Sequence, residues 1–142
     1  MSVETGLQFV DTNVLIYAHD MTAGARHTRA QALLAELWES GNGCLSIQTL
    51  QEFYVNITQK AKKQLDVPTA TRIVKALGKW TIHRPGVDDV LSAIAIQQRH
   101  RIAFWDAMIV NSAARLGCGV LWSEDLTSGQ VYDTVQVVNP FV

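Results

Sequence analysis

The sequence predicts a single α/β domain over residues 1–142, with a mainly parallel central sheet flanked by helices. Short apolar segments that suit strands alternate along the chain with longer segments whose apolar residues recur at helical spacing. This alternation favours parallel strands joined by right-handed crossovers. A length of 142 residues fits one domain, and a hydrophobic content of 48% is sufficient for a buried core.

Five short segments are expected to form the sheet. The predicted strands are residues 6–11, 44–47, 81–83, 120–122 and 135–138. We expect residues 81–83 to form an edge strand. Parallel sheets bind ligands beyond the carboxyl ends of their strands, so the residues that follow each strand are candidates for function.

Six segments are expected to form helices. The predicted helices are residues 12–19, 26–40, 48–63, 68–79, 87–100 and 105–116. Pro68 suits the first turn of its helix, and Gly117 suits a helix end. In residues 87–100 four apolar side chains at helical spacing are expected to face inward, namely Val90, Leu91, Ile94 and Ala95.

Some apolar side chains also have functional alternatives. The chain contains four tryptophans, Trp38, Trp80, Trp105 and Trp122. Tryptophan can stack on nucleic-acid bases, but we expect these four in the core. The two cysteines, Cys44 and Cys118, are expected to be buried free thiols.

Composition and charge exclude several classes of protein. A formal net charge of −1 gives no global basic field. Residues 1–10 lack the features of a signal peptide, and no apolar run is long enough to span a membrane, so we expect a cytoplasmic protein.

The charges are unevenly distributed along the chain. Residues 56–101 hold nine of the twelve basic residues and only three acids. This asymmetry suits a basic surface beside an acidic centre, or simply a solvated helical face.

Four acids lie at predicted strand ends or in the helices that follow them, namely Asp11, Glu52, Asp106 and Asp125. Converging carboxylates repel one another, and a divalent cation removes that penalty. Oxygen ligands with few other donors suit Mg²⁺ or Mn²⁺. Each acid also has an ordinary structural interpretation, as a helix cap, a helix-surface residue, a dipole partner or a turn residue.

Other chemistries have little support. The four histidines lack zinc-ligand spacing, and the chain has no C-x-x-C motif. A phosphate-binding glycine loop and a G-x-S-x-G elbow are also absent.

The chain resembles the PIN-domain nucleases in an ordered set of motifs. The similar segments are residues 9–18 (FVDTNVLIYA), 46–54 (SIQTLQEFY), 104–109 (FWDAMI), 121–126 (LWSEDL) and 138–141 (VNPF). They span nearly the whole chain, and its length is similar to that of the VapC-like toxins of bacterial toxin–antitoxin pairs.

This resemblance implies RNA cleavage that depends on Mg²⁺ or Mn²⁺, a homodimer, and inhibition by a VapB-type antitoxin. By motif position, the catalytic and metal-binding acids are Asp11, Glu52, Asp106 and Asp125. Glu124 is a second acid in the last motif. Asn13 and Ser123 match polar positions that support the site in relatives, and Trp105 is expected at the rim of the pocket.

Two surfaces follow as hypotheses. The residues expected to hold RNA along the rim are Lys60, Lys62, Lys63, Arg72 and Arg99. The predicted helices 26–40 and 48–63 could leave an apolar groove, with Trp38 and Tyr54, for an antitoxin helix. The alternatives are a PIN nuclease that processes RNA without an antitoxin, and a non-catalytic module that binds RNA or protein.

Overall fold

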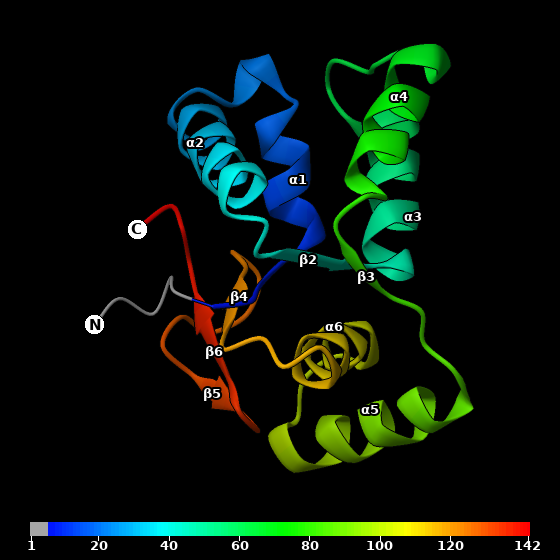
Figure 1. Ribbon diagram of the computed structural model, residues 1–142, viewed down its shortest axis with the longest axis vertical. Coiled ribbons are helices and arrows are strands. Elements are labelled where there is room, and N and C mark those ends of the chain that lie inside the picture. Colours follow the sequence, from blue (N-terminus) through cyan, green and yellow to red (C-terminus); the bar gives the residue numbers. More distant parts are fainter. Residues whose placement is uncertain (1–5) are drawn as a thin grey trace.

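The computed structural model describes residues 6–142, and a sheet lies between two layers of helices (Figure 1). The strands are β1 (Gln8–Val10), β2 (Gly43–Ser46), β3 (Thr81–His83), β4 (Val120–Trp122), β5 (Val131–Tyr132) and β6 (Val135–Val138). The α-helices are α1 (Thr12–Ala18), α2 (Ala25–Ser40), α3 (Ile47–Val55), α4 (Val67–Leu77), α5 (Val87–His100) and α6 (Phe104–Arg115). A 3₁₀ turn, η1 (Met21–Ala23), and a π-helical turn, η2 (Asn56–Lys60), complete the order. The predicted α/β class is confirmed.

The sheet has the order β3-β2-β1-β4-β6-β5. All neighbouring strands are parallel except β5 and β6. The predicted edge position of residues 81–83 is confirmed, because β3 is the outermost strand on its side. Strand β5 was not predicted: it has two residues, too few for a periodic signal, and pairs through a turn at Asp133 whose φ is 54°.

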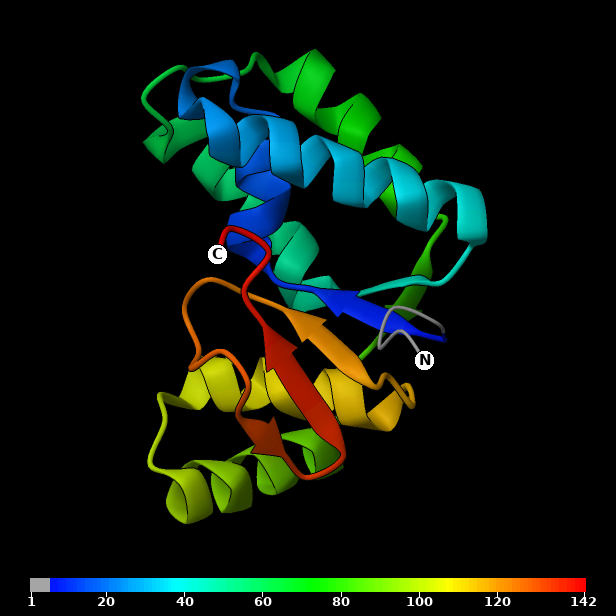
Figure 2. The same cartoon turned by 90° about the vertical axis from the view of Figure 1, so that its left-hand side faces the viewer.

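Alternation along the strands divides the core in two. Val10 and Leu45 belong to a cluster formed with α1, α2, α3 and α4, whereas Phe9 and Cys44 face α5 and α6. Successive strand residues point to opposite faces of a sheet, so β1 and β2 each contribute to both clusters. Figure 2 shows the same two helical layers from the side.

Helix α3 ends earlier than predicted. The expected helix 48–63 is α3, which ends at Val55, followed by η2. In η2 the Ala61 amide donates to the Asn56 carbonyl at 2.7 Å, a π-type bond, and extended backbone at Ala61 stops the helix. Apolar residues continue at helical spacing beyond Val55, where the helix widens into η2. The apolar pattern alone therefore predicts an α-helix that is too long.

The predicted inward face of α5 is wrong. Val90, Leu91, Ile94 and Ala95 are all exposed, with Leu91 at 59%. The buried residues of α5 are Asp89, Ala93 and Ile96. The small Ala93 side chain allows close packing on α6, and Asn111 of α6 donates a hydrogen bond to buried Asp89 at 2.9 Å. A polar residue therefore lies on the inner face, and apolar residues remain outside.

The other predictions about apolar side chains hold in part. Trp80 and Trp122 are buried as expected, but Trp38 and Trp105 are 45% and 62% exposed, so their predicted core positions are wrong. The thiols of Cys44 and Cys118 are free and buried, as predicted.

None of the helices described is long and apolar enough to cross a membrane. The expectation about a signal peptide concerns residues 1–5 in part, and these lie outside the described residues.

Candidate active site

Asp11 lies where the two central strands end side by side. It follows β1 and caps α1, its Oδ1 accepting a hydrogen bond from the Thr12 amide at 2.7 Å. Its own amide donates to the Trp122 carbonyl at the end of β4, at 2.9 Å. Ser123, the next residue along, donates from Oγ to Asp11 Oδ2 at 2.8 Å. The β1–β4 pairing thus fixes both the backbone and the carboxylate of Asp11.

The other three acids come from separate elements. Glu52 lies on α3, and its Oε1 accepts a hydrogen bond from Thr12 Oγ1 at 2.7 Å. Asp106 lies in the first turn of α6. Asp125 lies in the loop after β4, where its amide donates to Ser123 Oγ at 3.1 Å. Thr12 therefore connects Glu52 to Asp11, and Ser123 connects Asp125 to Asp11.

All four predicted acids line one cavity of about 250 Å³. The remaining lining residues are Thr12, Asn13, Ile16, Gln48, Asn56, Trp105 and Ile109. None of these described lining residues is Lys, Arg or His. The structure therefore brings the predicted acids together around a hollow, and the part of its lining that the structure describes holds no cationic side chain.

Burial, together with the charges of neighbouring acids, raises the pKa values of Asp11 and Asp106. Burial raises the pKa of Asp11 to about 7, with smaller contributions from Asp125 and Asp106, against the hydrogen bonds from Ser123 and Thr12. Burial also raises the pKa of Asp106, and the charges of Asp125 and Glu52 add to the effect. A cation in the cavity would relieve this repulsion.

The chemistry of the cavity fits a hard divalent cation. Among residues 6–142, no three His, Cys, Asp or Glu side chains are close enough to hold a metal ion as they stand. Mg²⁺ commonly keeps several waters and uses only one or two protein carboxylates. Two buried polar atoms in the cavity lining, Gln48 Oε1 and Asn13 Nδ2, also lack a hydrogen-bond partner. They could bond to the waters of such an ion.

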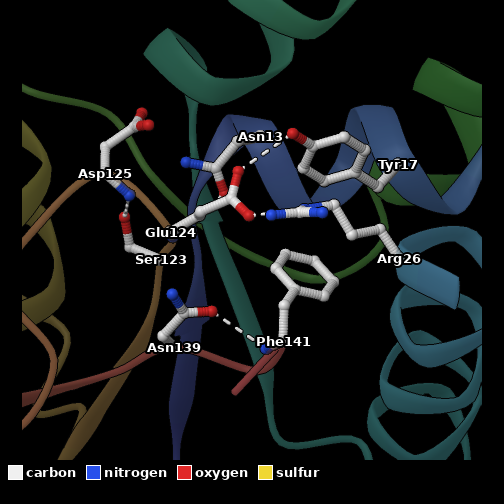
Figure 3. A network of polar contacts seen from close by, with 8 residues as sticks. All are labelled: Asn13, Tyr17, Arg26, Ser123, Glu124, Asp125, Asn139 and Phe141. Carbon is white, nitrogen blue, oxygen red and sulfur yellow. Dashed lines mark hydrogen bonds and ion pairs between the residues drawn. The ribbon is translucent and has the colours of Figure 1, made fainter. Parts of the chain in front are cut away.

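Glu124 does not take part in the cavity, although it is adjacent to Asp125. Its Oε1 accepts from the Tyr17 hydroxyl at 2.9 Å, and its Oε2 from Arg26 Nε at 2.6 Å. Figure 3 shows the carboxylates of Glu124 and Asp125 pointing to different sides of the loop. Of the two acids in this motif, only Asp125 lines the cavity.

Sequence reasoning missed two polar residues of the site. Gln48 and Asn56 lie four residues before and after Glu52, which places all three on one side of the helical segment. Gln48 Nε2 donates to the Trp105 carbonyl at 3.2 Å, and Asn56 Nδ2 donates to the Glu52 carbonyl at 2.9 Å. This four-residue spacing was the available signal. Asn13, Ser123 and the exposed rim residue Trp105 do lie at the site.

The predicted basic residues do not line the cavity. The four from the α3–α4 region, Lys60, Lys62, Lys63 and Arg72, are exposed. Arg99 belongs to α5 in the opposite helical layer and forms an ion pair with Asp133 at 2.6 Å (Figure 1). The basic segment of the sequence is thus divided between two layers.

A PIN-domain family model matches residues 9–131, and the chain belongs to the PIN-domain family. Solved structures share its fold. One is VapC20 of Mycobacterium tuberculosis, a toxin that cleaves the sarcin–ricin loop, with 19% identity and a TM-score of 0.62 over 83% of this chain and 89% of that one. Another is a toxin–antitoxin complex from Klebsiella pneumoniae, with 22% identity and a TM-score of 0.68 over 94% of this chain and 98% of that one. No curated protein matches the sequence.

Proposed function

We propose that this protein is a metal-dependent endoribonuclease that acts as the toxin of a toxin–antitoxin pair. The observation that carries the proposal is the cavity lined by Asp11, Glu52, Asp106 and Asp125. Membership of the PIN family supports a nuclease, and the fold is similar to one toxin that cleaves RNA and to one toxin–antitoxin complex.

In this proposal Asp11 and Asp106 hold Mg²⁺ or Mn²⁺, with Glu52 and Asp125 completing the acidic site. A bound divalent ion would lower the pKa of water and offset charge on the phosphodiester. Ser123 and the Thr12 amide keep the Asp11 carboxylate oriented, and the Thr12 hydroxyl does the same for Glu52. The four carboxylates without a cation would repel the RNA backbone.

The α3–α4 basic residues are proposed to hold RNA beside the cavity. Lys60, Lys62 and Lys63 are exposed and close together in sequence, so their combined charge would attract phosphates. Replacing all three with Gln should lower the salt dependence of RNA binding by roughly 2 in the log–log slope, the value for three contacts to a single strand. An unchanged slope would remove these lysines from the RNA surface.

Two protein surfaces are proposed for partners. The exposed apolar residues of α5 (Val87, Val90, Leu91 and Ile94) suit a homodimer, because a second copy would cover them. For the antitoxin we propose the side of α2 that carries Trp38, which is exposed and lines two separate hollows. RNA and an antitoxin as partners would place the protein in the cytoplasm.

Expression in growing bacteria tests the toxin role. The wild type should arrest growth, whereas Asp106→Asn should not, and Asp88→Asn, at an exposed position of α5, is the matched control. Coexpression of a small DNA-binding protein encoded beside the gene should restore growth. Growth arrest by Asp106→Asn would contradict a toxic nuclease, and RNA cleavage without growth arrest would favour the alternative of RNA processing. A chain that binds RNA but cleaves none would be the non-catalytic module.

A further inference from the structure

We propose that Glu124 is a positioning residue: Tyr17, Arg26 and Phe141 hold it outside the cavity, and this directs the adjacent Asp125 into it. The inference rests on the proposed function. We call these four residues the Glu124 clamp. Their contacts, together with those of Asn13 and Ser123, appear in Figure 3.

Both carboxylate oxygens of Glu124 are held from elements outside its loop. The Tyr17 hydroxyl of α1 donates to Oε1 at 2.9 Å, and Arg26 Nε of α2 donates to Oε2 at 2.6 Å. The Glu124 amide approaches Asn13 Oδ1 at 3.4 Å. Residue 124 is therefore fixed to two helices, at its side chain and near its backbone.

The C-terminal segment holds Arg26 in place. The Arg26 guanidinium lies 5.7 Å from the ring centroid of Tyr17 and 5.7 Å from that of Phe141. These two rings pack edge to face with their centroids 5.2 Å apart, and Asn139 Oδ1 accepts a hydrogen bond from the Phe141 amide at 2.9 Å. The clamp thus links the end of the chain to the loop after β4.

The clamp influences the direction of the Asp125 side chain because the two acids are adjacent in a short loop. Asp125 follows Glu124 directly, and its amide donates to Ser123 Oγ, which itself donates to Asp11. With residue 123 tied to Asp11 and residue 124 tied to α1 and α2, the backbone leaves the Asp125 side chain facing the cavity. Arg26 also balances the charge of Glu124, which would otherwise add a fifth uncompensated negative charge beside the four acids.

The stability of the fold does not account for the clamp, because the ion pair is solvent-accessible. The side chain of Arg26 is 52% exposed and that of Glu124 is 22% exposed. Ion pairs in such positions contribute little to the free energy of unfolding. Its loss should therefore alter the site while leaving the melting temperature nearly unchanged.

The test is Mn²⁺ binding to the purified full chain, measured by calorimetry, together with kcat and KM for a cleaved RNA. Glu124→Ala should weaken Mn²⁺ binding and lower kcat roughly tenfold, as loss of an outer contact commonly does, with KM little changed. Glu124→Gln keeps the oxygen that Tyr17 binds and should recover part of the loss. Arg26→Gln should give a smaller loss, and the double variant should be no worse than Glu124→Ala. Glu39→Gln, on the exposed surface of α2, is the control.

Wild-type Mn²⁺ affinity in Glu124→Ala would overturn the inference, as would tighter Mn²⁺ binding in Arg26→Gln, which would mean that a freed Glu124 joins the ion. A drop in melting temperature that parallels every loss of affinity would also overturn it, in favour of a purely structural role. Asp106→Asn separates the two proposals: if it binds Mn²⁺ like the wild type, the proposed function fails, whatever Glu124 does.

Discussion

Ser123 donates a hydrogen bond to Asp11 at 2.8 Å, although 112 residues separate the two in the chain. The parallel pairing of β1 with β4 brings them together, because each residue directly follows its strand. Asp11 is buried, and this bond favours its charged form.

Ser123→Ala should raise the pKa of Asp11 further, since the bond from Ser123 lowers it in the wild type. More of the Asp11 carboxyl would then be protonated at pH 7, and we expect Mn²⁺ binding to weaken several-fold there. At pH 8.5 the loss should be smaller. Calorimetric titration at the two pH values tests this, and equal Mn²⁺ affinity for wild type and variant at both would contradict it.

Without metal, stability should depend on the ionisation of Asp11. Its pKa is about 7 in the folded protein, against an ordinary value of 3.8. Between these values the folded state keeps a proton that the unfolded state has released, so the free energy of unfolding falls as pH rises from 4 to 7. The contribution is on the order of 4 kcal/mol, from about 1.4 kcal/mol per pKa unit.

Urea unfolding in EDTA across this pH range measures the effect. Asp11→Asn should flatten the pH dependence and be more stable than the wild type above pH 7, whereas exposed Asp88→Asn should behave like the wild type. An Asp11→Asn protein with the wild-type pH dependence would show that Asp11 does not carry this effect.

Asp89 should stabilise the fold without affecting the cavity. Its carboxylate accepts hydrogen bonds from the Gly86 amide at 2.8 Å and Asn111 Nδ2 at 2.9 Å. Burial alone would raise the pKa of Asp89, but these bonds and the nearby His83 and Arg115 outweigh it and lower the pKa. Its contribution is therefore present at neutral pH and is lost as pH falls through the lowered pKa.

Asp89→Ala leaves the buried Asn111 amide and the Gly86 amide without their acceptor and should lower the free energy of unfolding by about 2–4 kcal/mol at pH 7. Urea unfolding measures the loss, and Asp88→Ala, on the exposed side of the same turn, is the control. Mn²⁺ affinity should stay at the wild-type value. A loss no larger than that of Asp88→Ala would contradict a structural role for the Asp89 contacts.

The apolar face of α5 predicts an oligomer. Leu91→Glu and Ile94→Glu place a charge on this face, so a dimer in sedimentation velocity should become a folded monomer. Val67→Glu, at an exposed apolar residue of α4, should remain a dimer. A monomeric wild type, or dimeric α5 variants, would contradict this interface.

The position of the acids could be predicted because parallel strands share one carboxyl edge. Asp11 and Asp125 follow adjacent central strands, and Asp106 lies in the first turn of the helix that leads to β4, so their convergence follows from strand order. Which of the two adjacent acids, Glu124 or Asp125, faces the cavity depends on partners that are distant in sequence. Only the folded chain shows that Tyr17 and Arg26 bind Glu124.

The errors have local physical causes. On α5 the side with four apolar side chains is more hydrophobic than the side that the structure buries. The residues that pack inward are nevertheless Asp89, Ala93 and Ile96. Apolar periodicity measures hydrophobicity and takes no account of a polar residue whose hydrogen bonds are satisfied inside. Trp105 is exposed for another reason, because it lies in the first turn of α6 at the rim of the cavity.

The most direct test of the central claim is RNA cleavage by the purified protein with Mn²⁺, Mg²⁺ or EDTA. Wild type, Asp106→Asn and the exposed control Asp88→Asn are incubated with total RNA and with structured RNA. We predict discrete metal-dependent cleavage by the wild type and the control, and none by Asp106→Asn or in EDTA. Cleavage that persists in Asp106→Asn or in EDTA would contradict a metal-dependent nuclease centred on these acids.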